Sequence, residues 1–144
     1  DLYWYGIHGV ESLFTVMGPG VKTVTRSQTP DHELVTGIWN DGRIGTFRGL
    51  RAGKRSYGGT AFGSKANGSV GNYDGYAPLL LEIAKFFRTR EVPIAPEETI
   101  DIYAFMEAAD ESKRQNFAPV SVADVIVTAT LEADAKVTAL LTSP

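Results

Sequence analysis

The sequence has 144 residues, no cysteine and a formal net charge of −3. That length is enough for one domain with a hydrophobic core. The lack of cysteine excludes disulfide scaffolds, thiolate metal sites and cysteine nucleophiles. The negative charge gives no overall attraction to nucleic acid or to an anionic membrane surface, and no apolar run reaches the length of a membrane span, so neither is predicted as a partner. With only 2 histidines, no metal site is predicted.

The first predicted element is a helix over Leu2–Met17. Its apolar residues recur at helical spacing, and Gly18 follows as a stop signal. His8 and Glu11 lie three positions apart, so they occupy neighbouring positions on one face of this helix. The helix therefore brings an imidazole and a carboxylate together at the start of the chain.

A sheet is predicted next. Alternating β-branched residues indicate a strand over Val21–Arg26. Glu33–Trp39 and Arg43–Leu50 are expected to form an antiparallel hairpin, because the Asn40-Asp41-Gly42 turn between them tolerates positive φ angles. The glycine-rich stretch that follows predicts two further strands, near Ser56–Phe62 and Ser69–Tyr73.

The rest of the chain, from Pro78 onward, predicts helices. Pro78–Arg90 carries apolar residues around much of its circumference, which implies burial on more than one side. Glu97–Gln115 has Pro96 at its first turn, acids at its start and bases at its end. Ser121 can cap a third helix with a stripe of apolar residues, although the Val and Thr content also allows a strand. The order of the predicted elements, a helix, then strands, then helices, indicates an α+β domain with an open, mostly antiparallel β-sheet and helices packed on one face.

His8 is the first candidate for chemistry. A lone histidine on a half-buried helix is more often structural than catalytic, and no third partner lies nearby in the sequence. The neighbours of His8 favour a functional role, because Trp4 and Tyr5 place aromatic side chains beside the imidazole. Gly6 and Gly9 indicate that another group packs closely against the helix. That group could belong to a site, or it could equally be a neighbouring strand.

Other patterns have plainer explanations. Arg43, Arg48, Arg51, Lys54 and Arg55 form a basic cluster, but alternation along strands splits these charges between two faces. GGTAFG does not open an amphipathic helix, so it is not a nucleotide-binding loop. His32 is interpreted as a solvated turn residue, and the acids near Glu97 as helix-start and surface charges.

Three stretches together resemble the C-terminal domain of the glucose-fructose oxidoreductase, inositol dehydrogenase and rhizopine catabolism (Gfo/Idh/MocA) family. WYGIHGVESLFTVMG is similar to the family's opening D-x-G-x-H-x-x-D segment, with Gly6, His8 and Glu11 on the glycine, histidine and final acidic positions. WNDGRIGTFRG is similar to a hairpin of the family's sheet, and EAADESKRQNFAPVSV to its final stretch. The resemblance covers most of the chain, and its glycine-rich middle and its end match only loosely.

The resemblance implies that residues 1–144 are a single C-terminal domain for substrate binding and oligomerisation. An N-terminal Rossmann domain, absent from this chain, would bind most of the NAD or NADP and supply a lysine from a Glu-Lys-Pro motif. The apolar, motif-bearing start at Asp1 is likewise expected of a piece cut from a longer protein. A homo-oligomer through the sheet is also expected from the resemblance.

The resemblance assigns catalysis to His8, which would exchange a proton with the hydroxyl or carbonyl of a sugar or polyol substrate. An imidazole can do so near neutral pH. Trp4, Tyr5 and Glu11 are the predicted substrate-binding residues. Trp4 replaces the family's aspartate, which weakens the case for a polyol held by that carboxylate and leaves open an aromatic wall against a sugar face. The alternative is a non-catalytic oligomerisation or carbohydrate-binding module with a structural His8.

Overall fold

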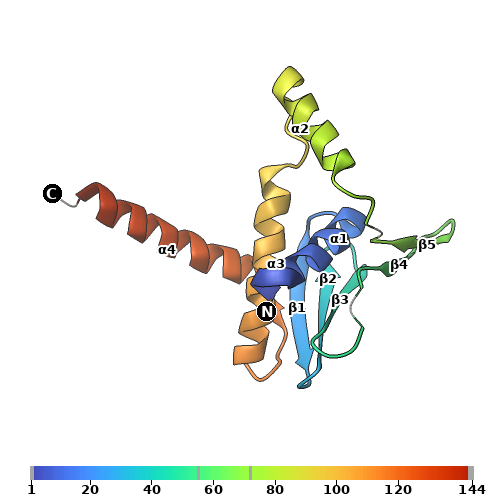
Figure 1. Cartoon of the computed structure of the whole chain (residues 1–144). Helices are drawn as coiled ribbons and strands as arrows, with labels where there is room; N and C mark the ends of the chain where they lie inside the picture. The colour runs from blue at the N-terminus through green and yellow to red at the C-terminus, as the bar shows by residue number, and fades with distance from the viewer. Residues whose placement is uncertain (1, 55, 72, 143–144) are drawn as a thin grey trace.

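The computed structural model describes residues 2–54, 56–71 and 73–142 of the chain, and they form an α+β fold (Figure 1). A four-stranded antiparallel sheet has the order β3-β2-β1-β6, and a separate two-stranded sheet is made by β4 and β5. The predicted fold class is confirmed. In chain order the elements are η1 (Leu2–Gly6), α1 (Ile7–Met17), β1 (Val21–Gln28), β2 (His32–Trp39), β3 (Ile44–Leu50), β4 (Gly59–Phe62), β5 (Asn67–Val70), α2 (Ala77–Thr89), α3 (Pro96–Arg114), β6 (Val120–Ser121) and α4 (Val122–Thr142).

The predicted β2–β3 hairpin forms as expected. Val35 pairs with Phe47 in its middle, and the turn closes through the N–H of Gly42, which donates to the carbonyl of Trp39 at 2.9 Å. Gly42 has φ 87°, in the left-handed region that glycine enters without strain. The Asp41 carboxylate accepts the backbone N–H of Arg43 at 3.1 Å. The turn residues therefore fix the register of the sheet.

Helices α1 and α3 cover one face of the sheet (Figure 1). The core between them contains three large rings, Phe14 from α1, Trp39 from β2 and Phe105 from α3. Phe14 lies 5.7 Å from each of the other two rings, centroid to centroid, within the range that aromatic pairs favour. Burial alternates along β2, and its buried residues, which include Val35 and Trp39, lie under the two helices.

The close approach that Gly9 indicated is made by a strand. A Cβ added at Gly9 would lie 2.4 Å from Cε2 of Phe47 on β3, so only glycine lets α1 come this near to the sheet. The glycine is explained by packing, and it fixes the position of the helix that carries His8 and Glu11.

Replacing Gly9 with alanine is therefore expected to lower the free energy of unfolding by about 1–3 kcal/mol, the usual cost of overpacking. Alanine gains about 1 kcal/mol of helix propensity over glycine, so a purely local effect would have the opposite sign. Urea denaturation followed by Trp39 fluorescence separates the two, and a stabilised Gly9→Ala variant would contradict the close contact.

Val122–Thr142 is helical, so the first of the two predicted alternatives is confirmed for this segment. The hydroxyl of Ser121 accepts the backbone N–H of Asp124 at 3.3 Å and caps α4. The strand alternative survives only in β6, whose Val120 and Ser121 pair with β1. Beyond its first turns, α4 extends away from the sheet with its apolar residues exposed (Figure 1).

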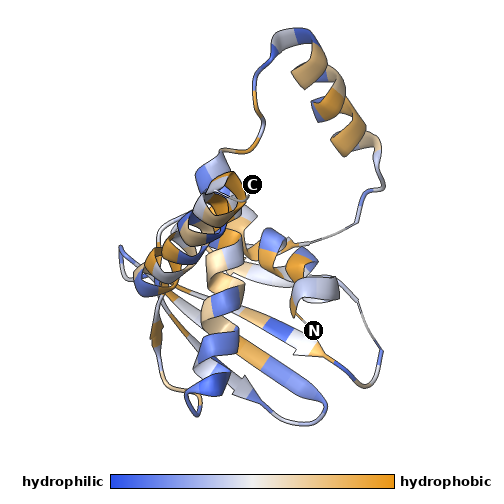
Figure 2. Cartoon of the chain, turned by 90° about the vertical axis from the view of Figure 1, so that its left-hand side faces the viewer, coloured by the Kyte–Doolittle hydropathy of each residue, from blue (hydrophilic) through white to orange (hydrophobic). Residues whose placement is uncertain are grey.

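The prediction that Pro78–Arg90 is buried on more than one side is wrong. The helix forms there as α2, but none of its residues is buried. It stands clear of the body of the fold, and Figure 2 shows hydrophobic residues along its length. The exposed large apolar residues of α2 are Leu79, Leu80, Leu81, Ile83 and Phe87. An apolar pattern indicates that a helix favours burial, but it does not indicate which surface covers the helix. Among the residues that the structure describes, none covers the apolar side chains of α2.

The two strands predicted in the glycine-rich segment form a small hairpin that is not hydrogen-bonded to the main sheet. β4 starts at Gly59, later than predicted, and β5 covers Asn67–Val70, earlier than predicted. Asn72, within the second predicted strand, lies outside the described residues.

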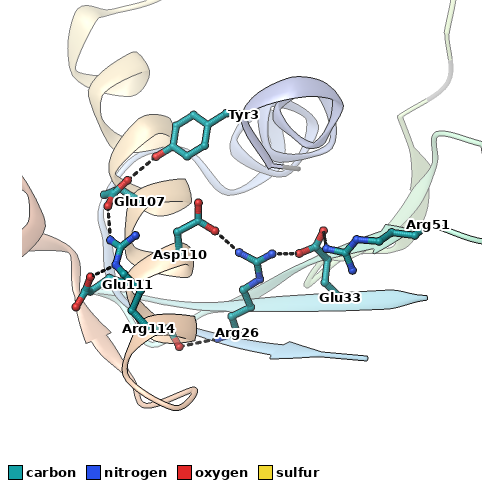
Figure 3. A network of polar contacts seen from close by, with 9 residues as sticks. Tyr3, Arg26, Glu33, Arg51, Glu107, Asp110, Glu111 and Arg114 are labelled. Carbon is teal, nitrogen blue, oxygen red and sulfur yellow. Dashed lines mark hydrogen bonds and ion pairs between the residues drawn. The ribbon is translucent and has the colours of Figure 1, made fainter. Parts of the chain in front are cut away.

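An ion cluster ties β1, β2 and α3 together beside the core (Figure 3). The guanidinium of Arg26, only 3% exposed, pairs with the carboxylates of Glu33 and Asp110. Arg51 reaches Glu33 at 3.0 Å from the end of β3. The backbone N–H of Arg26 donates to the hydroxyl of Ser112 at 3.0 Å. The cluster holds the sheet against α3.

Candidate functional site

The candidate site begins on the turn that precedes α1. Leu2 to Gly6 form a π-helical turn, a rare element that is frequent at functional sites. Leu2 is buried, and the Tyr3 hydroxyl donates to the Glu107 carboxylate at 2.9 Å (Figure 3). Burial and this hydrogen bond raise the pKa of the Tyr3 phenol. Leu2 is thus held in the core and Tyr3 is tied to α3, whereas Trp4 and Tyr5 project into solvent and are 76% and 66% exposed.

His8 and Glu11 form the predicted pair. The Nδ1 atom of His8 lies 3.1 Å from a carboxylate oxygen of Glu11, and the two side chains are 53% and 52% exposed. A carboxylate at Nδ1 favours the tautomer with a proton on that nitrogen, which leaves the lone pair of Nε2 free. The pair therefore has the arrangement of a general base with an orienting acid.

Aromatic rings continue on both sides of the imidazole. The Tyr5 ring lies 6.0 Å from that of His8 and 6.4 Å from that of Trp4, centroid to centroid. On the other side, Tyr57 from the segment before β4 lies 6.3 Å from His8. Successive rings meet edge to face, and we call these four residues the aromatic row. Sequence reasoning missed Tyr57 as a site residue, because no local pattern connects it to His8.

A polar hollow adjoins the row further along α1. It is lined by Ser12, Thr15, Val16, Ser69, Val70, Gly71 and Asp74. The hollow lies next to Tyr57, because Gly71 packs against Gly58: a Cβ added at Gly71 would lie 3.2 Å from the Gly58 Cα atom. His8 itself does not line this hollow. The imidazole lies on α1 one turn before Ser12, the first residue of α1 that does.

A second hollow lies between α1 and α2. It is wider and more apolar, and its lining residues are Thr15, Pro78, Leu79, Glu82, Lys85, Glu91, Val92, Pro93 and Ile94. Thr15 lines both hollows, so they meet at the middle of α1.

Two of the other charged candidates, Arg43 and Asp101, make local structural contacts. Arg43 donates to Asp41 at 2.7 Å, and its backbone and side-chain hydrogen bonds lower the pKa of the Asp41 carboxyl. Arg48 lies opposite exposed Leu34 on the open face of the sheet. Arg55 of the basic cluster lies outside the described residues. Asp101 accepts the backbone N–H of Gly20 at 2.7 Å, which ties α3 to the turn after α1.

The structure thus brings together all four predicted site residues, Trp4, Tyr5, His8 and Glu11, at the start of α1. Their catalytic and binding roles stay predictions. Within residues 2–54, 56–71 and 73–142, no group of three or more His, Asp or Glu side chains is placed to hold a metal ion. Over the same residues, no helix has the length and apolar character needed to cross a membrane. Comparisons with protein families, with curated proteins and with solved structures gave no match to this chain.

Proposed function

We propose that this chain is the substrate-binding and assembly domain of an NAD(P)-dependent oxidoreductase of the Gfo/Idh/MocA type, acting on a sugar or polyol-like substrate. The observation that carries the proposal is the His8–Glu11 pair, half-exposed and set within a row of exposed aromatic rings. The pair supplies acid–base chemistry, and the rings supply the apolar surface that the C–H faces of a sugar favour. This combination accounts for both the exposure and the neighbours of His8.

In the proposed reaction, the Nε2 atom of His8 takes the proton of the substrate hydroxyl. A nicotinamide bound by the full-length protein would accept the hydride from the carbon that bears this hydroxyl, so that a carbonyl would form. Glu11 holds the imidazole through Nδ1 and stabilises the positive charge that it acquires. Tyr5 and Trp4 orient the sugar ring against the imidazole. In the reverse direction His8 returns the proton to the carbonyl oxygen.

The nicotinamide supplies the hydride acceptor or donor when it is bound. The described residues do not fit a nucleotide site, because the glycine-rich GGTAFG stretch lies mainly on strand β4 and no helix starts from it. We therefore assign NAD or NADP binding to an N-terminal Rossmann domain of the full-length protein.

The second candidate is a non-catalytic carbohydrate-binding or oligomerisation module. The openness of the aromatic row favours it, because a small substrate is usually enclosed in a concave pocket. Sugar-dependent reduction of NAD⁺ or NADP⁺ by the full-length protein distinguishes the two. Reduction supports the oxidoreductase, whereas sugar binding without any nicotinamide binding favours the module.

We propose that assembly uses the open face of the main sheet. Ile38 and Ile44 are paired across β2 and β3 on the face opposite the helices, and both are exposed. A two-fold interface would bury them against the same residues of a second copy. Nucleic acid and membranes are not part of the proposal.

If the sheet is the interface, the double variant Ile38→Lys, Ile44→Lys is expected to convert the oligomer to a monomer, because like charges would meet across the two-fold axis. Leu81→Lys on α2 is the matched control, since it places the same charge on another exposed apolar residue. Analytical ultracentrifugation gives the mass. Dissociation by Leu81→Lys alone would contradict the sheet interface and point to α2 instead.

A further inference from the structure

The surface around His8 is longer than one sugar ring requires. His8, Ser12 and Thr15 follow one another on the same face of α1 at helical spacing, so the aromatic row leads directly into the polar hollow. Tyr57 stands where the two meet, because its neighbour Gly58 packs against Gly71 in the wall of the hollow. The stacking surface and the hydroxyl-bearing surface are therefore continuous.

The polar groups of the hollow suit the hydroxyls of a second sugar unit. Ser12 and Thr15 donate to carbonyls of their own helix at 2.9 Å, which leaves both oxygens as acceptors. Asp74 is exposed and contributes a carboxylate to the lining of the hollow. Ser69 adds a further hydroxyl from β5. A carboxylate and three hydroxyls form a polar lining of the kind that orients a ligand rich in hydroxyls.

We propose, building on the proposed function, that the substrate is a glycosidically linked sugar, at least a disaccharide, rather than a free monosaccharide. One unit lies against His8 between Tyr5 and Tyr57, and its neighbour occupies the hollow lined by Ser12, Thr15, Ser69 and Asp74. An open surface binds a single small ring weakly, because little of the ring is removed from water. Contacts in two adjoining subsites add, so a ligand that spans both binds more tightly.

The test is a calorimetric titration of this chain with glucose, maltose, cellobiose and their four-unit homologues. At least one disaccharide is expected to bind roughly tenfold more tightly than glucose, the equivalent of one or two additional hydrogen bonds. Asp74→Ala is expected to reduce that preference to near onefold while the affinity for glucose stays unchanged. Asp134→Ala removes a carboxylate from the exposed part of α4 and should leave the preference intact.

The outcomes separate this inference from the proposed function. Equal affinity for glucose and the disaccharides, with both lost in Tyr57→Ala, would overturn the second subsite and leave the sugar site at His8 standing. A chain-length preference that survives Asp74→Ala would overturn the placement of the second unit. Binding of none of these sugars, together with no sugar-dependent nicotinamide reduction by the full-length protein, would overturn both.

Discussion

Replacing Arg26 with methionine is expected to lower the free energy of unfolding by about 3–5 kcal/mol, the usual cost of removing one partner from a buried ion pair. Arg26 and Glu33 are 3% and 5% exposed, and Asp110 shares the same guanidinium. Without Arg26, the half-buried Arg51 is the one counter-charge that pairs with the Glu33 carboxylate among residues 2–54, 56–71 and 73–142. Methionine fills much of the volume, so the loss reports the uncompensated charge and not a cavity.

The chain provides a matched control for this experiment. Arg114 also pairs with two carboxylates, those of Glu107 and Glu111, but its side chain is 56% exposed. Arg114→Met is therefore expected to cost less than about 1 kcal/mol, as exposed ion pairs do. Urea denaturation followed by the fluorescence of buried Trp39 measures both variants. Equal losses for Arg26→Met and Arg114→Met would contradict the role assigned to burial.

His8→Ala in the full-length protein is expected to lower turnover of the sugar by roughly 10²–10⁴-fold, the contribution of a positioned acid or base. Glu11→Gln should lower it less, because glutamine can still accept a hydrogen bond from Nδ1 but lacks the charge that stabilises the imidazolium. His32→Ala is the control, since His32 is the other of the 2 histidines and lies exposed at the start of β2. Steady-state kinetics on purified variants gives the ratios.

Unchanged turnover in His8→Ala would remove the imidazole from the mechanism and return it to a structural role. A loss in kcat with little change in KM is the pattern expected of a group that acts in the chemical step. If instead KM rises and kcat stays constant, His8 binds the substrate without transferring its proton.

The elements that could be predicted from the sequence are those with a local cause. The Asn40-Asp41-Gly42 turn set the β2–β3 hairpin, and Ser121 set the start of α4 through its side-chain cap. The environment of α2 could not be predicted, because an apolar helix has the same pattern whether its own chain or another surface covers it. The Arg26 cluster was also missed, since its carboxylates come from two other elements.

The same distinction applies to the site. The contact between His8 and Glu11 followed from their spacing on one helix, and the neighbouring Trp4 and Tyr5 followed from sequence adjacency. Tyr57 reaches His8 only because the chain returns after β3, which no short-range pattern encodes. The π-helical turn that directs Trp4 and Tyr5 outward also has no sequence signature that separates it from an ordinary first turn.

The most direct test of the proposed sugar site is the fluorescence of Trp4 during titration with sugars. Trp4 is 76% exposed in the aromatic row and Trp39 is 2% exposed in the core, so only Trp4 can report on a ligand there. A sugar stacked on the row should shift its emission to shorter wavelength and protect it from acrylamide, and Trp4→Phe should abolish both effects. Sugar-dependent turnover by the full-length protein with unchanged Trp4 emission and quenching would contradict the assignment of this surface as the substrate site.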